Sequence, residues 1–422
     1  MRIYFLLLFV PALASAQPLS RFLEAAEVAN LDVQLQAANH ARSSAEAGQV
    51  WGGLLPAVTA SGAFVRNQYK AEVAVPAGPT SSDTITIAPL NQLDGSLRVE
   101  VPLIDVNRWL QTSSALATVR AAEQREQGTR AQVRREVVLS YYSAAGAQAL
   151  LEAATQSLQV ARAQAEQQQA RAAAGVATEL ELVRASAEIQ RNEQVIADAR
   201  ALEANARRTL FSLTSVGATV FPALTADDLH LEAPLAELEG SVPGLPGVRA
   251  AEEDAKAAKQ TQLAAATALI PRLDAQFTQR FTNATGFSGQ TAAWNAGATF
   301  SWRLDAPIVQ GIRAASAREQ ISALTAAKAR LAATDQLHSD WQRTIAAASK
   351  QKAAQAQVVA ARRAAALASE RNAAGVATQL DLISADRDRL QAEVNDIMAR
   401  YELASARACL RLSTGRPPEV TP

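Results

Sequence analysis

The chain has 422 residues, of which 49% are hydrophobic but only 5% aromatic, and alanine is abundant. This composition favours helices that pack closely over a thick globular core. The 41 lysines and arginines balance the 41 aspartates and glutamates. The formal net charge of zero gives no attraction to nucleic acid or to anionic lipid, so we expect no nucleic-acid partner.

Residue types that carry chemistry are few. His40, His230 and His338 lie far apart in the sequence, and the single cysteine, Cys409, has no partner for an intramolecular disulfide. We interpret the histidines as surface residues and the cysteine as a small packed side chain. No nucleotide-binding loop or nucleophile constellation is present. The sequence therefore predicts neither an enzyme nor a protein that holds a metal or another cofactor.

The first sixteen residues are typical of a signal peptide. Arg2 supplies a positive charge, residues 3–14 form an apolar run, and Ala14-Ser15-Ala16 is a small-residue cleavage site. Twelve apolar residues are too few for a membrane anchor, since a spanning helix needs about 20. The next residue is Gln17 rather than cysteine, so we expect no lipid at the mature N-terminus. No later apolar run reaches spanning length, which indicates an exported chain rather than a helical membrane protein.

Two long stretches without helix breakers predict two unusually long helices. Residues 107–174 contain no proline, and residues 308–374 contain no proline and a single glycine. Each stretch would form roughly 100 Å of helix at 1.5 Å per residue. Such lengths are typical of coiled coils or helical repeats. Shorter helices are expected over residues 19–50 and 248–268.

A thirteen-residue segment at 171–183 recurs at 371–383 with nine identical residues. A repeat of this length at a fixed offset indicates two copies of one structural unit. In each copy a glycine fits the left-handed position that ends a helix, a threonine fits the N-cap of a returning helix, and an acid fits its third position. These residues are Gly175, Thr178 and Glu181 in the first copy, and Gly375, Thr378 and Asp381 in the second.

The returning helices are expected over residues 178–213 and 378–412, and a Pro/Gly-rich segment follows the first of them. Apolar side chains recur along both helices with alternating spacings of three and four, a heptad stripe. The stripes are Leu182, Ala185, Ile189, Asn192, Ile196 and Ala199, and Leu380, Ile383, Arg387, Leu390, Val394, Ile397 and Tyr401. We divide the chain into a signal peptide (1–16), a first repeat (17–217), a linker (218–247), a second repeat (248–415) and a tail (416–422).

Four segments alternate between apolar and polar residues and predict β-strands, two in each half. They lie at residues 58–66, 96–103, 273–281 and 294–304, whereas residues 73–91 and 282–293 show no regular pattern. Their length of about 9–11 residues is that of a tilted strand crossing a bilayer. Trp294, Phe300 and Trp302 share one face, as a lipid-facing aromatic belt requires. A soluble, half-buried sheet would show the same alternation.

The number of strands limits how a lipid-facing sheet, as opposed to a soluble one, could form. A sheet in lipid must close, because an open edge leaves backbone groups without hydrogen bonds. Four strands cannot close, since membrane barrels begin at about eight. If the strands face lipid, several copies of the chain must pool them in a symmetric ring.

The chain resembles the TolC-type family of outer-membrane channels, which serve efflux pumps and type I secretion systems. The resemblance covers the whole mature length and rests on the order of several motifs. They are Gly-Val-Ala-Thr-x-Leu-[Glu/Asp]-Leu in both halves, Trp51-Gly-Gly-Leu-Leu-Pro56, Val101-Pro-Leu-Ile-Asp105 and Leu269-Ile-Pro271. It implies a mainly helical chain with membrane β-structure: a homotrimer with a 12-stranded outer-membrane β-barrel, continued through the periplasm by an α-helical barrel.

The resemblance also implies partners and site residues. The hairpin ends would dock a periplasmic adaptor protein that connects the channel to an inner-membrane pump. These ends are Gly175, Val176, Ala177 and Thr178, and Gly375, Val376, Ala377 and Thr378. Asp381 matches an aspartate that rings the family's aperture, and Glu181 matches an acidic partner of its closing network. Asn372, Ala377 and Ser384 replace residues that close the channel in other members, so those contacts do not carry over.

We therefore expect an outer-membrane exit duct that exports small molecules such as drugs, located in the outer membrane and extending into the periplasm. An exit duct for protein secretion has the same fold. A periplasmic adaptor is an alternative of a different class, but it needs one helical hairpin and a compact β-rich core. A structural coiled-coil protein would not explain the export signal or the strands.

Overall fold

The computed structural model describes residues 17–78, 81–224, 227–230 and 232–418. The expected signal peptide lies outside the described residues. The described residues divide into two compact units: one lies within residues 17–38, 124–249 and 329–418, and the other within residues 39–123 and 250–328. We call them the helical unit and the sheet unit. Each unit contains segments of both sequence repeats, and the predicted mainly helical fold built from two repeats is confirmed.

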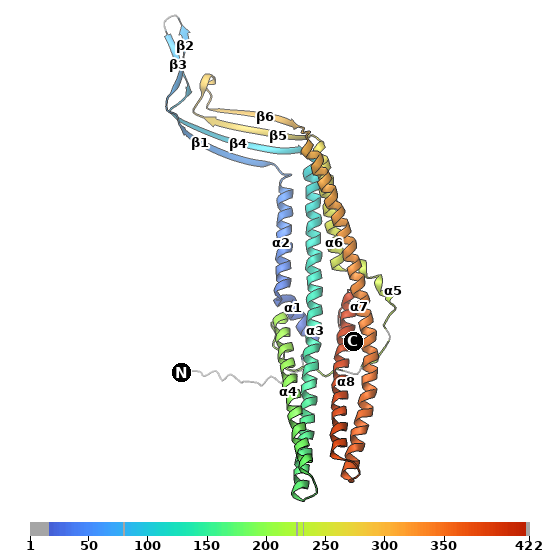
Figure 1. Cartoon of the computed structure of the whole chain (residues 1–422). Helices are drawn as coiled ribbons and strands as arrows, with labels where there is room; N and C mark the ends of the chain where they lie inside the picture. Colours follow the sequence, from blue (N-terminus) through green and yellow to red (C-terminus); the bar gives the residue numbers. More distant parts are fainter. Residues whose placement is uncertain (1–16, 79–80, 225–226, 231, 419–422) are drawn as a thin grey trace, which may run out of the picture. The chain divides into compact units, whose positions relative to one another are not determined.

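The long helices and their returns lie where the sequence predicts them (Figure 1). The long helices are α3 (Val106–Ala173) and α7 (Ala306–Ala373), and the returning helices are α4 (Glu179–Thr214) and α8 (Gln379–Ser413). Helix α6 (Pro246–Ala266) precedes the second pair of strands, and the linker contains α5 (Leu235–Glu239) and a 3-10 turn, η1 (Val242–Gly244). Among the described helices, none combines the length and the apolar character needed to cross a bilayer.

The single N-terminal helix expected over residues 19–50 is in fact two helices, α1 (Leu19–Ala29) and α2 (Leu31–Gly52). Asn30 separates them in an extended conformation, with φ −68° and ψ 128°. Its side-chain oxygen accepts hydrogen bonds from the backbone N–H groups of Asp32 (2.9 Å) and Val33 (3.3 Å). Asparagine thus caps α2 and ends α1, because its side chain competes for backbone hydrogen bonds.

The four predicted strands form one antiparallel sheet with the order β1-β4-β5-β6. Their bounds are β1 (Ala57–Arg66), β4 (Asn91–Ile104), β5 (Arg272–Thr282) and β6 (Ala292–Ser301). Two further strands, β2 (Ala71–Gly78) and β3 (Ser81–Ala88), form a hairpin in a segment without a regular sequence pattern (Figure 1). Their register shifts at both ends, which interrupts the alternation by which strands are recognised. Short 3-10 turns, η2 (Thr267–Leu269) and η3 (Gly286–Ser288), flank β5.

The strand register gives the four-stranded sheet one apolar and one polar face. Side chains that share a face alternate along each strand, and paired residues across the sheet carry the same character. One row is Val58, Val99, Phe277 and Ala296, and the adjacent row on the other face is Thr59, Arg98, Thr278 and Asn295. Polar-face residues bond to one another, as in Ser61 with Ser96 (2.8 Å) and Arg280 with Asp94 (3.0 Å). Gln279 is an exception on the apolar face.

The main core of the helical unit joins α1, α3, α4, α8 and the start of the linker. Phe22 and Tyr141 lie with ring centroids 5.6 Å apart, and Phe221 lies 5.2 Å from Tyr141. Cys409 is buried in the same cluster, as the sequence predicts, and burial raises the pKa of its thiol.

A buried ion pair joins the two long helices within the helical unit. Arg135 of α3 donates two hydrogen bonds to Asp340 of α7, at 2.7 and 2.5 Å, and Ser413 of α8 donates a third. The Asp340 side chain is only 2% exposed. Burial by itself would raise the pKa of Asp340, but the bonds from Arg135 and Ser413 outweigh it and hold the pKa below its usual range.

Candidate functional site

The two hairpin ends have the same backbone geometry. Gly175 and Gly375 adopt φ values of +72° and +74°. In the first hairpin the Gly175 N–H donates to Ala172 O and the Val176 N–H donates to Arg171 O, both at 2.9 Å. The second hairpin repeats these bonds at the corresponding positions. This pair of bonds is the Schellman motif that ends a helix at a left-handed glycine, so the predicted turns are confirmed.

Each returning helix begins with a reciprocal capping box. The Thr378 backbone N–H donates to Asp381 Oδ2 (2.9 Å), and the Asp381 N–H donates to Thr378 Oγ1 (3.2 Å). Thr178 and Glu181 make the same two bonds at 2.7 and 3.4 Å. The two carboxylates that the family resemblance assigns to the aperture are therefore bound at the N-termini of their own helices within one chain.

These contacts set the charge of both carboxylates. Hydrogen bonds from the side chain and backbone of Thr378 lower the pKa of Asp381. The backbone and side chain of Thr178 lower the pKa of Glu181 in the same way. Both groups therefore carry a full negative charge at neutral pH at the ends of the hairpins.

The hairpin ends expose apolar side chains. Val176 is 64% exposed and Val376 66%, and Leu180 and Leu380 one turn into the returning helices are 56% and 49% exposed. Ala177 and Ala377 are half-buried, and Thr178 and Thr378 are exposed. The end of each hairpin therefore exposes a valine and a leucine.

Three polar contacts join the hairpins near their ends, and the sequence does not predict them. Gln168 of α3 donates to Gln379 of α8 (2.8 Å), and both residues are buried. Gln164 of α3 donates to Asp386 of α8 (2.5 Å). Arg387 Nε of α8 donates to Glu188 of α4 (2.8 Å). We call these contacts the inter-hairpin links; in Figure 1 the hairpins lie side by side.

The predicted apolar stripes fare differently in the two returning helices. In α4 most predicted stripe positions are buried, including Asn192 and Ile196. In α8 only Ile383 of the predicted stripe is buried, and the buried face runs instead through residues such as Leu382, Ala392 and Ala399. Arg387, the charged position of the α8 stripe, pairs with Glu188 of α4.

The proposed lipid belt lies on the apolar face of the sheet. Trp294, Phe300 and Trp302 are 69%, 65% and 59% exposed. Trp294 stacks on Phe277 of the neighbouring strand, with ring centroids 6.2 Å apart. Trp302 lies just beyond the end of β6, where its indole N–H donates to Leu269 O (3.1 Å). These three large aromatic side chains are therefore more than half exposed in the part of the chain that the structure describes.

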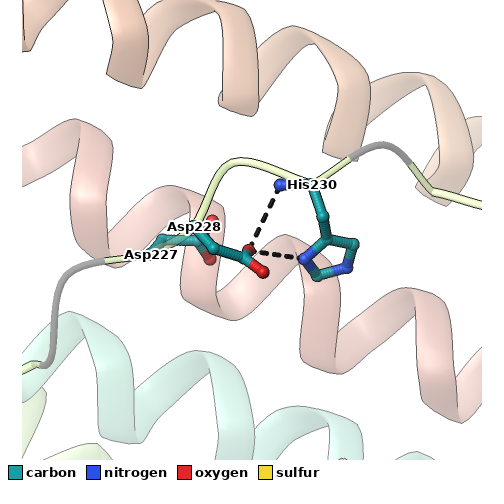
Figure 2. A group of neighbouring side chains, drawn as sticks. All are labelled: Asp227, Asp228 and His230. Carbon is teal, nitrogen blue, oxygen red and sulfur yellow. Dashed lines mark hydrogen bonds and ion pairs between the residues drawn. The ribbon is translucent and has the colours of Figure 1, made fainter.

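A cluster of Asp227, Asp228 and His230 in the linker resembles a metal-binding group (Figure 2). Asp228 Oδ1 accepts from the backbone N–H of His230 (3.2 Å) and lies 2.6 Å from its Nδ1. Arg407 of α8 enters the cluster, donating to Asp227 Oδ1 (2.9 Å) and to His230 O (3.1 Å). The guanidinium supplies the positive charge that a metal would bring, so we interpret the cluster as a fastening of the linker to α8.

The described residues combine long helical hairpins with a sheet that has one apolar and one polar face. A sequence profile described as "Outer membrane efflux protein" matches residues 22–216 and 245–416. The chain therefore belongs to the outer membrane efflux protein family, as the motifs predict. It is an outer-membrane channel that extends into the periplasm and not an enzyme.

Solved structures share the fold. The outer-membrane channel OprN superposes with a TM-score of 0.79 at 22% identity, covering 95% of this chain and 90% of that one. The Campylobacter jejuni CmeC outer membrane channel gives 0.81 at 17% identity, covering 94% and 85%. The open state of the Neisseria gonorrhoeae MtrE channel gives 0.78 at 18%, covering 95% and 91%. No curated protein matches the sequence significantly.

Proposed function

We propose that the protein is the exit duct of a tripartite efflux system and exports small molecules together with a periplasmic adaptor and an inner-membrane pump. The observation that carries this proposal is the two-faced sheet. Among the described strands, β1 pairs only with β4, and β6 pairs only with β5. Both outer strands thus have free backbone groups along one edge.

Free edges are incompatible with lipid in a single chain. Each unpaired backbone group in hydrocarbon costs several kcal/mol. If β6 of one copy pairs with β1 of the next, three copies give twelve strands and no edge remains. The apolar faces then contact outer-membrane lipid, and the polar faces line a water-filled lumen.

The aromatic side chains fit the thickness of the membrane. Trp294 and Trp302, the latter one residue beyond the end of β6, are eight residues apart, which corresponds to about 27 Å of extended chain. With the usual strand tilt of about 35–45° this length covers a height of about 19–22 Å, most of the apolar band of about 25 Å that aromatic girdles flank. We assign Trp294 and Trp302 to opposite girdles and Phe300 to the lipid between them.

The hairpin ends supply the adaptor site in this proposal. Val176, Val376 and the adjacent Leu180 and Leu380 offer apolar side chains that are exposed in the single chain. The turns Gly175–Thr178 and Gly375–Thr378 present them on a rigid, capped backbone. A helical hairpin of an adaptor would bury these side chains.

The aperture lies at the same level. A threefold axis would place three Asp381 carboxylates around one opening, with Glu181 nearby, and such a ring favours cations. The inter-hairpin links hold the two hairpins of each chain together beside this opening. We propose that an adaptor opens the channel by separating the hairpins at these links.

Asp381→Asn tests the aperture, because the substitution removes the charge and keeps an oxygen that can accept from Thr378. We expect lower cation preference of single channels in planar bilayers, with unchanged trimer yield. Asp388→Asn, an exposed residue of the same helix, is the matched control. Equal selectivity in both variants would remove Asp381 from the constriction.

Deletion of the gene in its own host tests the function. We expect intracellular accumulation of a fluorescent efflux dye to rise and to return to normal on complementation. Cross-linking of the outer-membrane fraction should yield a trimer. Normal dye efflux together with loss of a secreted protein would instead identify a protein-secretion duct, and recovery of a free periplasmic monomer would contradict the barrel.

A further inference from the structure

Four hydrogen bonds hold Gln17, the first residue that the structure describes. Its backbone N–H donates to Val220 O (3.0 Å), and its carbonyl accepts from Tyr141 Oη (3.0 Å). Its side-chain Nε2 donates to Gly217 O (3.4 Å), and Oε1 accepts from the Thr219 N–H (3.2 Å). The residue is only 7% exposed. Residues at chain ends are usually poorly ordered unless such contacts hold them.

Apart from Tyr141 of α3, the partners of Gln17 lie in the segment between α4 and α5, which has no regular secondary structure at residues 216–224. Backbone groups in such a segment need hydrogen-bond partners other than those of a helix or a sheet. Arg207 takes Ala218 O and Thr219 O (2.9 Å), and Gln148 accepts from the Phe221 N–H (3.2 Å). Gln17 bonds to the neighbouring Gly217 O, Thr219 N–H and Val220 O. It is therefore part of the structure that fixes the linker.

Gln17 is also the first residue after the predicted cleavage site. Cleavage there converts its backbone nitrogen into a free α-amine. An N-terminal glutamine can then cyclise: the amine attacks Cδ of its own carboxamide, a lactam C–N bond forms, the Cδ–Nε2 bond breaks, and ammonia leaves. No oxidant, cofactor or second substrate is needed. The product is pyroglutamate.

We propose that Gln17 is a modification site under the control of folding. In the folded protein Gln17 keeps its carboxamide, because its hydrogen bonds hold the side chain in place. In a mature chain in which these bonds have not yet formed, Gln17 cyclises to pyroglutamate. The reason is geometric, because cyclisation brings Cδ onto the amine nitrogen. The carboxamide cannot reach that position while it is held between Gly217 O and the Thr219 N–H.

Pyroglutamate at position 17 would form fewer of these hydrogen bonds than glutamine does. The lactam keeps one N–H, which can still bond to Val220 O. It loses the primary amide, so the hydrogen bond from Gln17 Nε2 to Gly217 O would be lost. Cyclisation before folding therefore weakens the attachment of the linker, and folding before cyclisation prevents the modification.

Intact-mass spectrometry of the full-length protein purified from the outer membrane tests this proposal. We expect a chain that begins at an open Gln17. During incubation with glutaminyl cyclase, the protein unfolded in urea should lose the mass of one ammonia at least about tenfold faster than the folded protein, since the side-chain bonds need to break first. Urea-treated substrate peptide controls for the activity of the cyclase.

Two variants sharpen the test. Tyr141→Phe removes the bond to the Gln17 carbonyl and keeps the packed ring, so the folded variant should cyclise several-fold faster. Tyr401→Phe, at a partly buried tyrosine of the same unit, should behave like the parent chain. Retention of residues 1–16, pyroglutamate in the protein as isolated, or equal rates for folded and unfolded chains would each overturn the proposal. None of these results affects the assignment as an efflux channel.

Discussion

Within the helical unit, the contacts that join the two hairpins in the middle of the long helices differ from those near the hairpin ends. In the middle of the long helices, the Arg135–Asp340 pair is buried, and Ser413 adds a third bond. Near the hairpin ends, the uncharged Gln168–Gln379 link is buried, whereas the Arg387 and Glu188 side chains are 42% and 13% exposed. A buried ion pair is costly to break because it leaves an uncompensated charge, whereas an exposed pair contributes little. We therefore expect the Arg135–Asp340 pair to resist separation of the hairpins more than the Arg387–Glu188 pair does.

Breaking the buried Arg135–Asp340 pair should have the largest effect on stability. Asp340→Ala leaves Arg135 without its carboxylate, and we expect a loss of about 3–5 kcal/mol in the free energy of unfolding. Asp335→Ala, at an exposed position of the same helix, should change stability by less than about 0.5 kcal/mol. Thermal unfolding of both variants in the same detergent measures the difference. Similar melting temperatures would show that the middle of the long helices is not held together by the ion pair.

Acid should weaken the same contact less severely, because a protonated Asp340 still packs in its place. The folded-state pKa of Asp340 is lowered, so its stabilising contribution is fully present above the unfolded pKa of about 3.9 and is lost as pH falls through the folded value. Asp340→Asn should flatten the fall of stability below about pH 4. Asp388→Asn should not. An unchanged slope in Asp340→Asn would assign the acid sensitivity to other carboxylates.

At the hairpin ends, substitution of a turn glycine should have an intermediate effect on stability. A Cβ at Gly375 would meet no atom within 4 Å of it, but φ is +74°. Gly375→Ala should therefore cost about 1–2 kcal/mol through backbone strain alone. Gly48→Ala, inside α2 and also without close neighbours, should stabilise by about 0.5–1 kcal/mol. Chemical denaturation compares the two, and stabilisation by both would contradict the left-handed turn.

The smallest effect is expected at a salt bridge that both repeats contain. Arg162 bonds to Glu193 (3.0 Å), and Arg362 bonds to Glu393 (2.9 Å), 200 positions later. Both arginines are more than half exposed, so Arg162→Gln and Arg362→Gln should each cost about 0.2–1 kcal/mol. The losses should add, since the two pairs share no partner. A clearly larger combined loss would show that the hairpins are coupled near their ends.

Local patterns predicted most of the secondary structure. The absence of proline over residues 107–174 and 308–374 predicts α3 and α7, and the glycine and threonine of each repeat predict the Schellman turn and the capping box. The reason is that these features involve residues within about five positions of one another. Where the local signal is weak, the prediction failed: Asn30 divides an expected single helix, and the register shifts of β2 and β3 conceal a hairpin.

Contacts between distant residues could not be read from the sequence. Gln168 and Gln379 are 211 positions apart, and Arg135 and Asp340 are 205 apart. Each residue alone is an ordinary polar side chain on a helix, and nothing in its neighbours indicates a partner. Gln17 was noted only because it is not cysteine, and its four bonds depend on the linker and α3.

The sequence by itself determined the two repeats, the long helices, the turns, the strands and the family, because helix breakers, caps and alternation act over a few residues. Tertiary structure alone decided which strands pair and which side chains join the hairpins. These depend on the register of the strands and the rotation of helices far apart in the sequence, and packing sets those quantities.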